Sequence, residues 1–412
     1  MIKRIITFIA LSIFSISAIF ADLYKPHRIF EIGIDGDIAA ANSSVALKDI
    51  LTKNLVIDLP KISSEMPDDG FKFSLFNKEN FFMNLNVSSR FRFGLFTSIE
   101  ASSNMNISKD LFDLLGDGFS AGDSKTVDVK GQGDVFMSIG ASFQTIIKNY
   151  GVKITPAYVV PLVYVPSTTA SGTLKTDSSG LIKMEAEANL DIYTAIDMEK
   201  FMENGKNFSD LELNAANILS NGGFDLTLEV ERNWLHGLNA GAYIRIPMIP
   251  GTLKYKMSTR VYASIYETNA LGYIRGSEEH GKDYGHDDFS YSSANYKVFR
   301  PFKFGFNASY APFGEWFKIQ PLLGFGLRNP YSSDIVFYPE YALDLIVCDP
   351  LQSVNFSVGT AYQEQIFIQR MRLGFNFRVL EIYTQIGLCG TNLKASFERN
   401  GYNASIGLRL GY

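Results

Sequence analysis

Few side chains in this sequence of 412 residues have the types and the spacing that catalysis needs. General acid–base and nucleophilic chemistry commonly uses a histidine close to a nucleophile. The histidines are His27, His236, His280 and His286, and no Gly-x-Ser-x-Gly motif or other nucleophile signature accompanies them. The sequence therefore predicts no catalytic residue and a protein that is not an enzyme.

Metal or disulfide chemistry is equally weakly indicated. His280 and His286 lie six residues apart among carboxylates, and imidazole with carboxylate can hold a divalent metal. The Gly-rich, polar surroundings of this pair are more typical of a solvated loop, so we expect no metal site and no cofactor. Two cysteines, Cys348 and Cys389, cannot staple a chain of this size, and they leave open one bridge or two separate thiols.

The composition excludes two further classes of protein. With 46% hydrophobic and 14% aromatic residues, the chain has too much apolar material for a disordered protein. The net charge of -5 offers no electrostatic footprint for a nucleic-acid partner.

The first residues have the pattern of an export signal. Lys3 and Arg4 precede an apolar run that ends at Ala21, a small residue suited to cleavage. We predict a signal peptide over residues 1–21, and the alternative is an uncleaved anchor, because Ile19 is bulkier than the usual cleavage pattern prefers. After Ala21 no apolar stretch approaches the ~18 residues that a spanning helix needs.

Strict alternation of apolar and polar residues dominates the rest of the chain, as in strands with one apolar face. Residues 302–310 and 354–362 are clear examples. Many alternating segments reach the ~9 to 11 residues that a tilted strand needs to cross a bilayer. Their polar positions are rich in Gly, Ser and Asn, which suits a barrel interior. The fold class predicted is all-β, a closed antiparallel transmembrane β-barrel; the alternative is a secreted soluble β protein.

The last strand carries the most specific pattern. Ile406, Leu408, Leu410 and the terminal Tyr412 share one face, behind the turn pair Asn400-Gly401. This ending resembles the carboxy-terminal assembly signal of bacterial outer-membrane barrels. The resemblance implies a place in the bacterial outer membrane, with outer-membrane lipid and the barrel-assembly machinery as partners.

The number of strands is less sharply defined by the pattern. Counting segments gives 12 to 18 candidates, and about 14 is the expected value, since an even number is expected. Residues 165–222 do not settle into a clear up-and-down order. Residues 267–295, polar and Gly-rich, are expected to form a long external loop.

If the apolar faces meet lipid, the charged residues in the alternate positions line the lumen. Early and late strands become neighbours on closure, so the arginines would share one wall, and the acids from the middle of the chain would lie opposite. We expect a polarised constriction; the alternative is that these charges lie at different heights, pair locally or line the rims. The lumen-lining candidates are Arg90, Arg92, Arg370, Arg372, Arg378, Arg409, Glu185, Glu187, Asp191, Asp225, Glu229 and Glu231.

The segment before the first clear alternation suggests a family. Residues 22–69 have a short helical pattern and the size of an inward-folded plug, which leaves residues 70–412 for the barrel; alternatively, residues 30–37 are simply the first strand. A plug of this size, the export signal and the closing strand resemble the long-chain fatty-acid transport channels of outer membranes. The family's Asn-Pro-Ala motif is absent, so no ligand-binding residue is transferred.

The resemblance implies a channel for passive uptake of hydrophobic small molecules such as long-chain fatty acids. The charged inner positions instead favour a diffusion porin for polar solutes. A third possibility is a surface-exposed adhesin in which the long loops carry the function.

Overall fold

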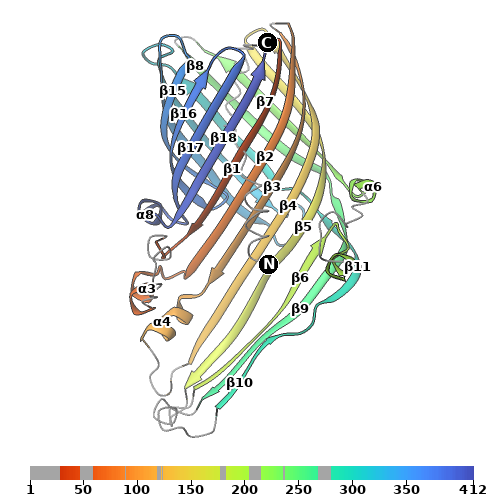
Figure 1. Cartoon of the computed structure of the whole chain (residues 1–412), viewed down its shortest axis with the longest axis vertical. Helices are drawn as coiled ribbons and strands as arrows, with labels where there is room; N and C mark the ends of the chain where they lie inside the picture. Colours follow the sequence, from red (N-terminus) through yellow and green to blue (C-terminus); the bar gives the residue numbers. More distant parts are fainter. Residues whose placement is uncertain are drawn as a thin grey trace.

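The chain forms a closed ring of antiparallel strands with a sheet that projects from one end (Figure 1). The computed structural model describes residues 28–46, 59–88, 90–117, 122, 124–176, 182–203, 215–234, 237–267 and 280–412. The signal peptide predicted over residues 1–21 lies outside these ranges.

Fourteen strands make the ring, as the alternation predicts. Their order around the wall is β1, β2, β3, β4, β5, β7, β8, β12, β13, β14, β15, β16, β17 and β18, and β18 pairs with β1 over Glu31↔Gly411 to Ala41↔Gly401. Closure leaves no unpaired wall strand, which a sheet in lipid requires because its backbone amides have no water to bond.

The strands are β1 (Phe30–Asn42), β2 (Phe71–Ser88), β3 (Phe91–Ile107), β4 (Ser124–Ile147), β5 (Tyr150–Thr176), β6 (Ile182–Thr194), β7 (Gly223–Asn233), β8 (Leu238–Ile249), β9 (Gly251–Glu267), β10 (His280–His286), β11 (Ser290–Val298), β12 (Phe302–Tyr310), β13 (Phe317–Arg328), β14 (Val336–Cys348), β15 (Val354–Gln363), β16 (Ile366–Asn376), β17 (Leu380–Gly390) and β18 (Gly401–Gly411). The helices are α3 (Leu59–Glu65), α4 (Lys109–Asp117), α5 (Met198–Glu203), α6 (Ala215–Leu219) and α8 (Leu393–Phe397). No helix in the described ranges is both long and apolar enough to cross a membrane.

The polarity of the wall is inverted relative to a water-soluble protein. On β2, the large apolar side chains of Phe81, Met83 and Leu85 are exposed, whereas the polar side chains of Asn84 and Asn86, which alternate with them, are partly buried. The same period of two, with apolar groups outside, recurs on β3, β14, β15 and β16. An exposed apolar band around a polar interior is what a bilayer demands of a barrel.

The two ends of the ring differ. At the end where the chain terminates, which we call the short-turn end, β2–β3, β4–β5 and β16–β17 are joined by connections of two or three residues. Exposed aromatic side chains are frequent there, among them Trp234, Phe313, Trp316 and Phe377. Such aromatic residues typically mark the boundary between hydrocarbon and headgroups.

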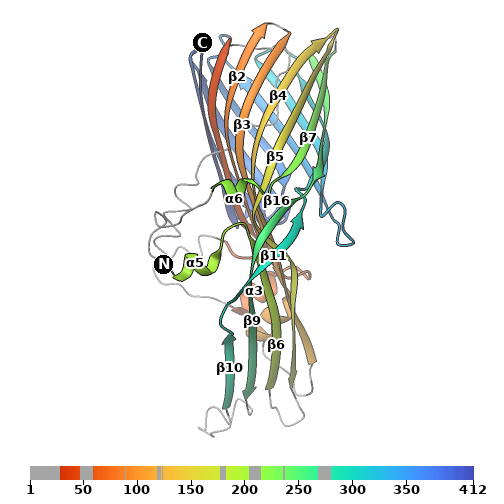
Figure 2. The same cartoon turned by 90° about the vertical axis from the view of Figure 1, so that its right-hand side faces the viewer.

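At the opposite end the same sheet continues beyond the ring, and we call this part the extension (Figure 2). β4 and β5 continue beyond the ring. Their full lengths are 24 and 27 residues, far more than the ~9 to 11 that cross a bilayer. β6 pairs with the far part of β5 and with β9, and β10 and β11 pair with β9. The β4–β5 register shifts between Gly131 and Gly133 and between Val135 and Phe136, where the ring passes into the extension.

Two expectations about connections need correction. The barrel begins at Phe30, not at residue 70, because Phe30–Asn42 is a wall strand between β18 and β2. The interpretation of residues 22–69 as a plug is therefore wrong for residues 30–42. Within the same segment, α3 lies against α4. Residues 22–27 and 47–58 are outside the described ranges. Residues 280–286 and 290–295, expected in an external loop, belong to strands β10 and β11 of the extension.

Candidate functional site

The lumen is crossed by charged side chains from opposite walls. Arg328, at the end of β13, donates to Asp134 on β4, although β5, β7, β8 and β12 lie between these strands around the ring. Arg328 also donates to Glu364 at 2.5 Å. Lys303 on β12 donates to Glu364 at 2.8 Å and to Glu340 at 2.6 Å. We call these five residues the cross-lumen bridge.

A second group of charges continues this layer. Glu100 on β3 is in register with Phe136 on β4, two positions from the Ser102↔Asp134 pair. It accepts hydrogen bonds from Arg300, which precedes β12, and from Arg245 on β8, at 3.2 and 3.3 Å. Lys78 on β2 lies 3.1 Å from the same carboxylate.

The two groups together are electrically balanced. Arg300 also lies 3.5 Å from Asp225 on β7, so this layer holds five acids and five bases. Buried charges are tolerated when each has an opposite partner, and removing one partner typically costs about 3 to 5 kcal/mol. The described side chains thus form a neutral barrier that links the β2–β4 wall to the β12–β14 wall and to the β15–β16 turn.

A third polar cluster lies nearer the short-turn end. Asp35 on β1 accepts from the hydroxyl of Tyr383 at 3.0 Å and lies 3.8 Å from Arg409. Arg409 in turn lies 3.5 Å from Glu381, and Glu31 pairs with Arg92 at 3.2 Å. These contacts join β1, β3, β17 and β18 and stabilise the closure of the ring from inside.

The turn that carries Glu364 is unusual. β15 and β16 are joined by Glu364 and Gln365, both in the left-handed backbone region with φ of 48° and 66°. A two-residue hairpin turn commonly has this conformation, but Asn-Gly is the preferred pair. A non-glycine residue held there costs about 1 to 3 kcal/mol. The contacts of Glu364 therefore help to keep a strained turn in place.

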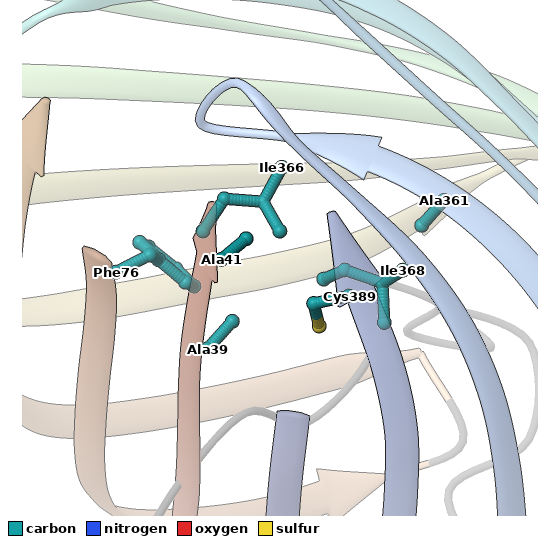
Figure 3. Close-up of a cluster of buried hydrophobic side chains, with 7 residues drawn as sticks. All are labelled: Ala39, Ala41, Phe76, Ala361, Ile366, Ile368 and Cys389. Carbon is teal, nitrogen blue, oxygen red and sulfur yellow. The ribbon is translucent and has the colours of Figure 1, made fainter. Parts of the chain in front are cut away.

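An apolar cluster lies beside this turn, on the inner face of the wall (Figure 3). Ile366 and Ile368 of β16 are buried together with Cys389 of β17, and Figure 3 shows Ile366 beneath the hairpin turn. The other members come from β1, β2 and β15, and they are Ala39, Ala41, Phe76 and Ala361. Packing of the cluster therefore depends on the position of the β15–β16 hairpin.

The arginines predicted to line the lumen divide into two sets. Arg92, Arg370, Arg372 and Arg409 project from strands close to the closure, and Arg370 pairs with Asp344 at 2.5 Å. The prediction is wrong for Arg90 and Arg378, because both are exposed residues of turns at the short-turn end.

The predicted acids divide in the same way. Asp225, Glu229 and Glu231 are on the wall strand β7, where Glu229 pairs with Lys153 at 2.8 Å. Glu185, Glu187 and Asp191 are on β6, which pairs beyond the ring, so their placement in the lumen wall is wrong. Charges on β6 pair with Lys183, Arg260 and Lys256 in the extension. The acid wall is thus smaller than expected and is neutralised locally.

The sequence did not single out the residues that cross the lumen. Glu364 stands in Gln363-Glu364-Gln365, which has no pattern of its own, and Arg300 lies between strands. Arg328 ends an alternating segment, so the sequence predicts that its side chain points inward. The sequence does not predict its partner on β4, because this contact depends on the shape of the ring across the lumen.

The cysteines and histidines within the described ranges form no metal or disulfide site. Cys348 and Cys389 are both free, and they lie at opposite ends of their wall strands. Within the described ranges, no group of three or more His, Cys, Asp or Glu side chains could hold a metal ion. His286 is exposed on the extension, and its ring lies 5.6 Å from that of Phe289.

Comparison with known proteins finds similarity in fold only. No protein-family model and no curated protein matches the chain. The P. putida toluene transporter TodX has a TM-score of 0.45 at 8% identity, covering 95% of this chain and 91% of that one. The translocator domain of the autotransporter NalP from Neisseria meningitidis scores 0.31 at 7% identity over 93% and 88%. A mutant Rh. blastica porin scores 0.26 at 7% identity over 93% and 99%. The resemblance to long-chain fatty-acid channels stays a prediction.

Proposed function

We propose that this protein is an outer-membrane channel for small molecules and that the cross-lumen bridge represents its closed state. The inverted polarity of the closed fourteen-stranded wall carries the proposal, since apolar groups are exposed and charged groups are buried. Barrels of this kind have short turns on the periplasmic side and longer connections outside the cell. The short-turn end would then face the periplasm, and the extension would face the medium.

Small polar solutes fit the described lumen best. Its crossing layer consists of paired carboxylates, guanidinium groups and ammonium groups, which interact poorly with hydrocarbon. An opened bridge would present these groups to the solute. The channel would then act as a diffusion porin.

Uptake of hydrophobic molecules such as long-chain fatty acids is the second candidate. The observation in its favour is a pair of apolar clusters. One is the cluster around Cys389, and the other joins β4, β5, β9 and β11 through Phe136, Val159, Leu253 and Val298. Either could receive an apolar ligand. A role as an adhesin stays a prediction.

Removal of the central arginine tests the channel. Arg328→Ala deletes the contacts to Asp134 and Glu364 together, so we expect a higher single-channel conductance than for the wild type in planar bilayers. The matched control is Arg260→Ala, which removes an arginine paired with Glu187 in the extension. Correct folding is checked by the heat-modifiable mobility of the barrel in detergent gels.

The outcomes separate the candidates. A conductance of Arg328→Ala equal to that of the wild type and of the control would contradict a lumen closed by the bridge. Swelling of Arg328→Ala liposomes in sugars of graded size would support polar diffusion. Saturable binding of a fluorescent fatty acid without swelling would support hydrophobic uptake.

A further inference from the structure

We infer that the β15–β16 hairpin is the moving part of the closure and that Glu364 is the latch that holds it across the lumen. This regulation rests on the proposed channel function. It assigns to one turn the transition between a blocked and an open lumen.

The hairpin tip has little backbone support. β14 pairs with β15 only from Tyr341↔Tyr362 onward, although β14 itself starts at Val336. On the other side, β16 pairs with β17 from Phe367↔Gly390. The backbone of Gln363 and Ile366 pairs across the hairpin alone, so the tip can swing without breaking the ladders of the ring.

Side-chain contacts, in contrast, hold the tip to three other strands. The carboxylate of Glu364 accepts from Lys303 on β12, from Arg328 on β13 and, at 3.4 Å, from the hydroxyl of Tyr338 on β14. Glu364 and Gln365 occupy the left-handed region, which is costly for residues other than glycine. A strained turn held by one buried carboxylate is a suitable two-state element.

Movement of the tip has two linked consequences. The first is electrostatic, because Arg328 loses Glu364 and keeps only Asp134, and Lys303 keeps only Glu340. The second is steric, because Ile366, which lies before the β16–β17 ladder, would leave the cluster in which Cys389 is fully buried, whereas Ile368 stays paired with Cys389. Exposure of the Cys389 sulfur therefore reports the position of the hairpin, independently of any transport.

The experiment uses this native thiol in the full chain. Cys348→Ser removes the other cysteine, which lies at the short-turn end of β14. In that background, Glu364→Gln is compared with Glu340→Gln, because both carboxylates contact the same Lys303 nitrogen but only Glu364 is on the hairpin. The readouts are the rate of Cys389 modification by a membrane-impermeant maleimide and the single-channel conductance.

We expect Glu364→Gln to speed Cys389 modification about ten-fold or more, as the loss of charge-assisted hydrogen bonds would shift the equilibrium. Glu340→Gln should stay within about two-fold of the parent, because the tip keeps its three contacts. Glu364→Asp keeps the charge with a shorter reach and should give an intermediate rate, which preserves the test if Glu364→Gln does not fold.

The results bear separately on the latch and on the channel. An unchanged rate in both Glu364 variants, or an equal rise in Glu340→Gln, would overturn the latch. Faster modification together with higher conductance supports the latch and the channel. Faster modification without any conductance supports the movement of the hairpin and overturns the proposed channel.

Discussion

Arg370 and Arg372 stand two positions apart on β16 and face the same lumen, but their surroundings differ. Arg370 forms a bidentate pair with Asp344, at 2.9 and 2.5 Å. The guanidinium carbon of Arg372 lies 3.6 Å from the ring centre of Tyr383, and none of the described carboxylates lies within ion-pair distance of it. Its buried Nε has no hydrogen-bond partner among the described groups. One arginine therefore neutralises a buried acid, and the other stacks on an aromatic ring.

This contrast predicts different costs for the same substitution. Arg370→Gln leaves the Asp344 carboxylate without its partner and should lower the free energy of unfolding by about 3 to 5 kcal/mol. Arg372→Gln removes a stacked cation, an interaction worth about 0.5 to 2 kcal/mol. Urea-induced unfolding from liposomes measures both. Equal losses would contradict the assignment of the Asp344 pair as the stronger contact.

For single residues, the sequence predicted which side chains point into the lumen better than it predicted their ion-pair partners. The inward positions of Arg92, Arg370 and Arg409 follow from alternation and from the expected closure. Their partners, Glu31, Asp344 and Glu381, belong to other strands. Which charges meet depends on register and on the shape of the lumen, and neither is encoded in the alternation of one strand.

Among the elements, the β6–β9 pair shows how the extension is held together. Asp191 on β6 accepts hydrogen bonds from Lys256 and Ser258 on β9, both at 2.8 Å. Partial burial acts to raise the pKa of Asp191, but these hydrogen bonds outweigh it and hold the pKa below the usual 3.8. Because the folded value is depressed, the pair stabilises the sheet above pH 3.8 and loses this effect as the pH falls through the folded pKa.

Acid should therefore loosen β6 selectively. We expect the peptide 182–194 to lose hydrogen-exchange protection, after correction for the intrinsic rate, once the pH falls below 3.8. Asp191→Asn should remove most of this pH dependence. Glu185→Gln is the control, because Glu185 is exposed and pairs with Lys183 of its own strand. Persistence of the full acid effect in Asp191→Asn would assign it to another group.

There is a physical reason why alternation assigned β6 and the far part of β5 incorrectly. β6 alternates like a wall strand, because its apolar face follows the same period whether lipid or another layer covers it. The register between β4 and β5 shifts at two places, opposite Gly131–Gly133 and opposite Val135–Phe136. Each shift changes which side chains of β5 face outward, so the alternation along this continuous strand is interrupted twice. For this reason the stretch from residue 165 onward did not settle into a regular order.

For the whole molecule, the pairing of β1 with β18 is the feature that makes a sheet into a ring. Ile38 and Ala404 are partners in this ladder, whereas Leu408 pairs with Ile34. In a background without the native cysteines, we expect Ile38→Cys with Ala404→Cys to form a disulfide on mild oxidation. Ile38→Cys with Leu408→Cys, four positions out of register, should not, because their Cα atoms would be about 13 Å apart.

Mass spectrometry of the linked peptides measures the result. A bridge in the control pair, or none in the matched pair, would contradict the register at the closure. The alternation limited the number of strands to 12–18, with about 14 expected, and it identified the last strand, whereas a first strand at residues 30–37 was only the alternative to a plug. Phe30–Asn42 does alternate, with Ile32 and Ile34 on one face and Asp35 and Asp37 on the other, but its Ala-rich end gives it the helical pattern that suggested a plug.

The pairing of the first strand with the last also constrains the order of events in biogenesis. β1 acquires its second neighbour only after residues 401–411 have been synthesised, so until then the sheet has two unpaired edges. Hydrocarbon does not tolerate such edges. We therefore expect the closing ladder to form before hydrocarbon surrounds the wall.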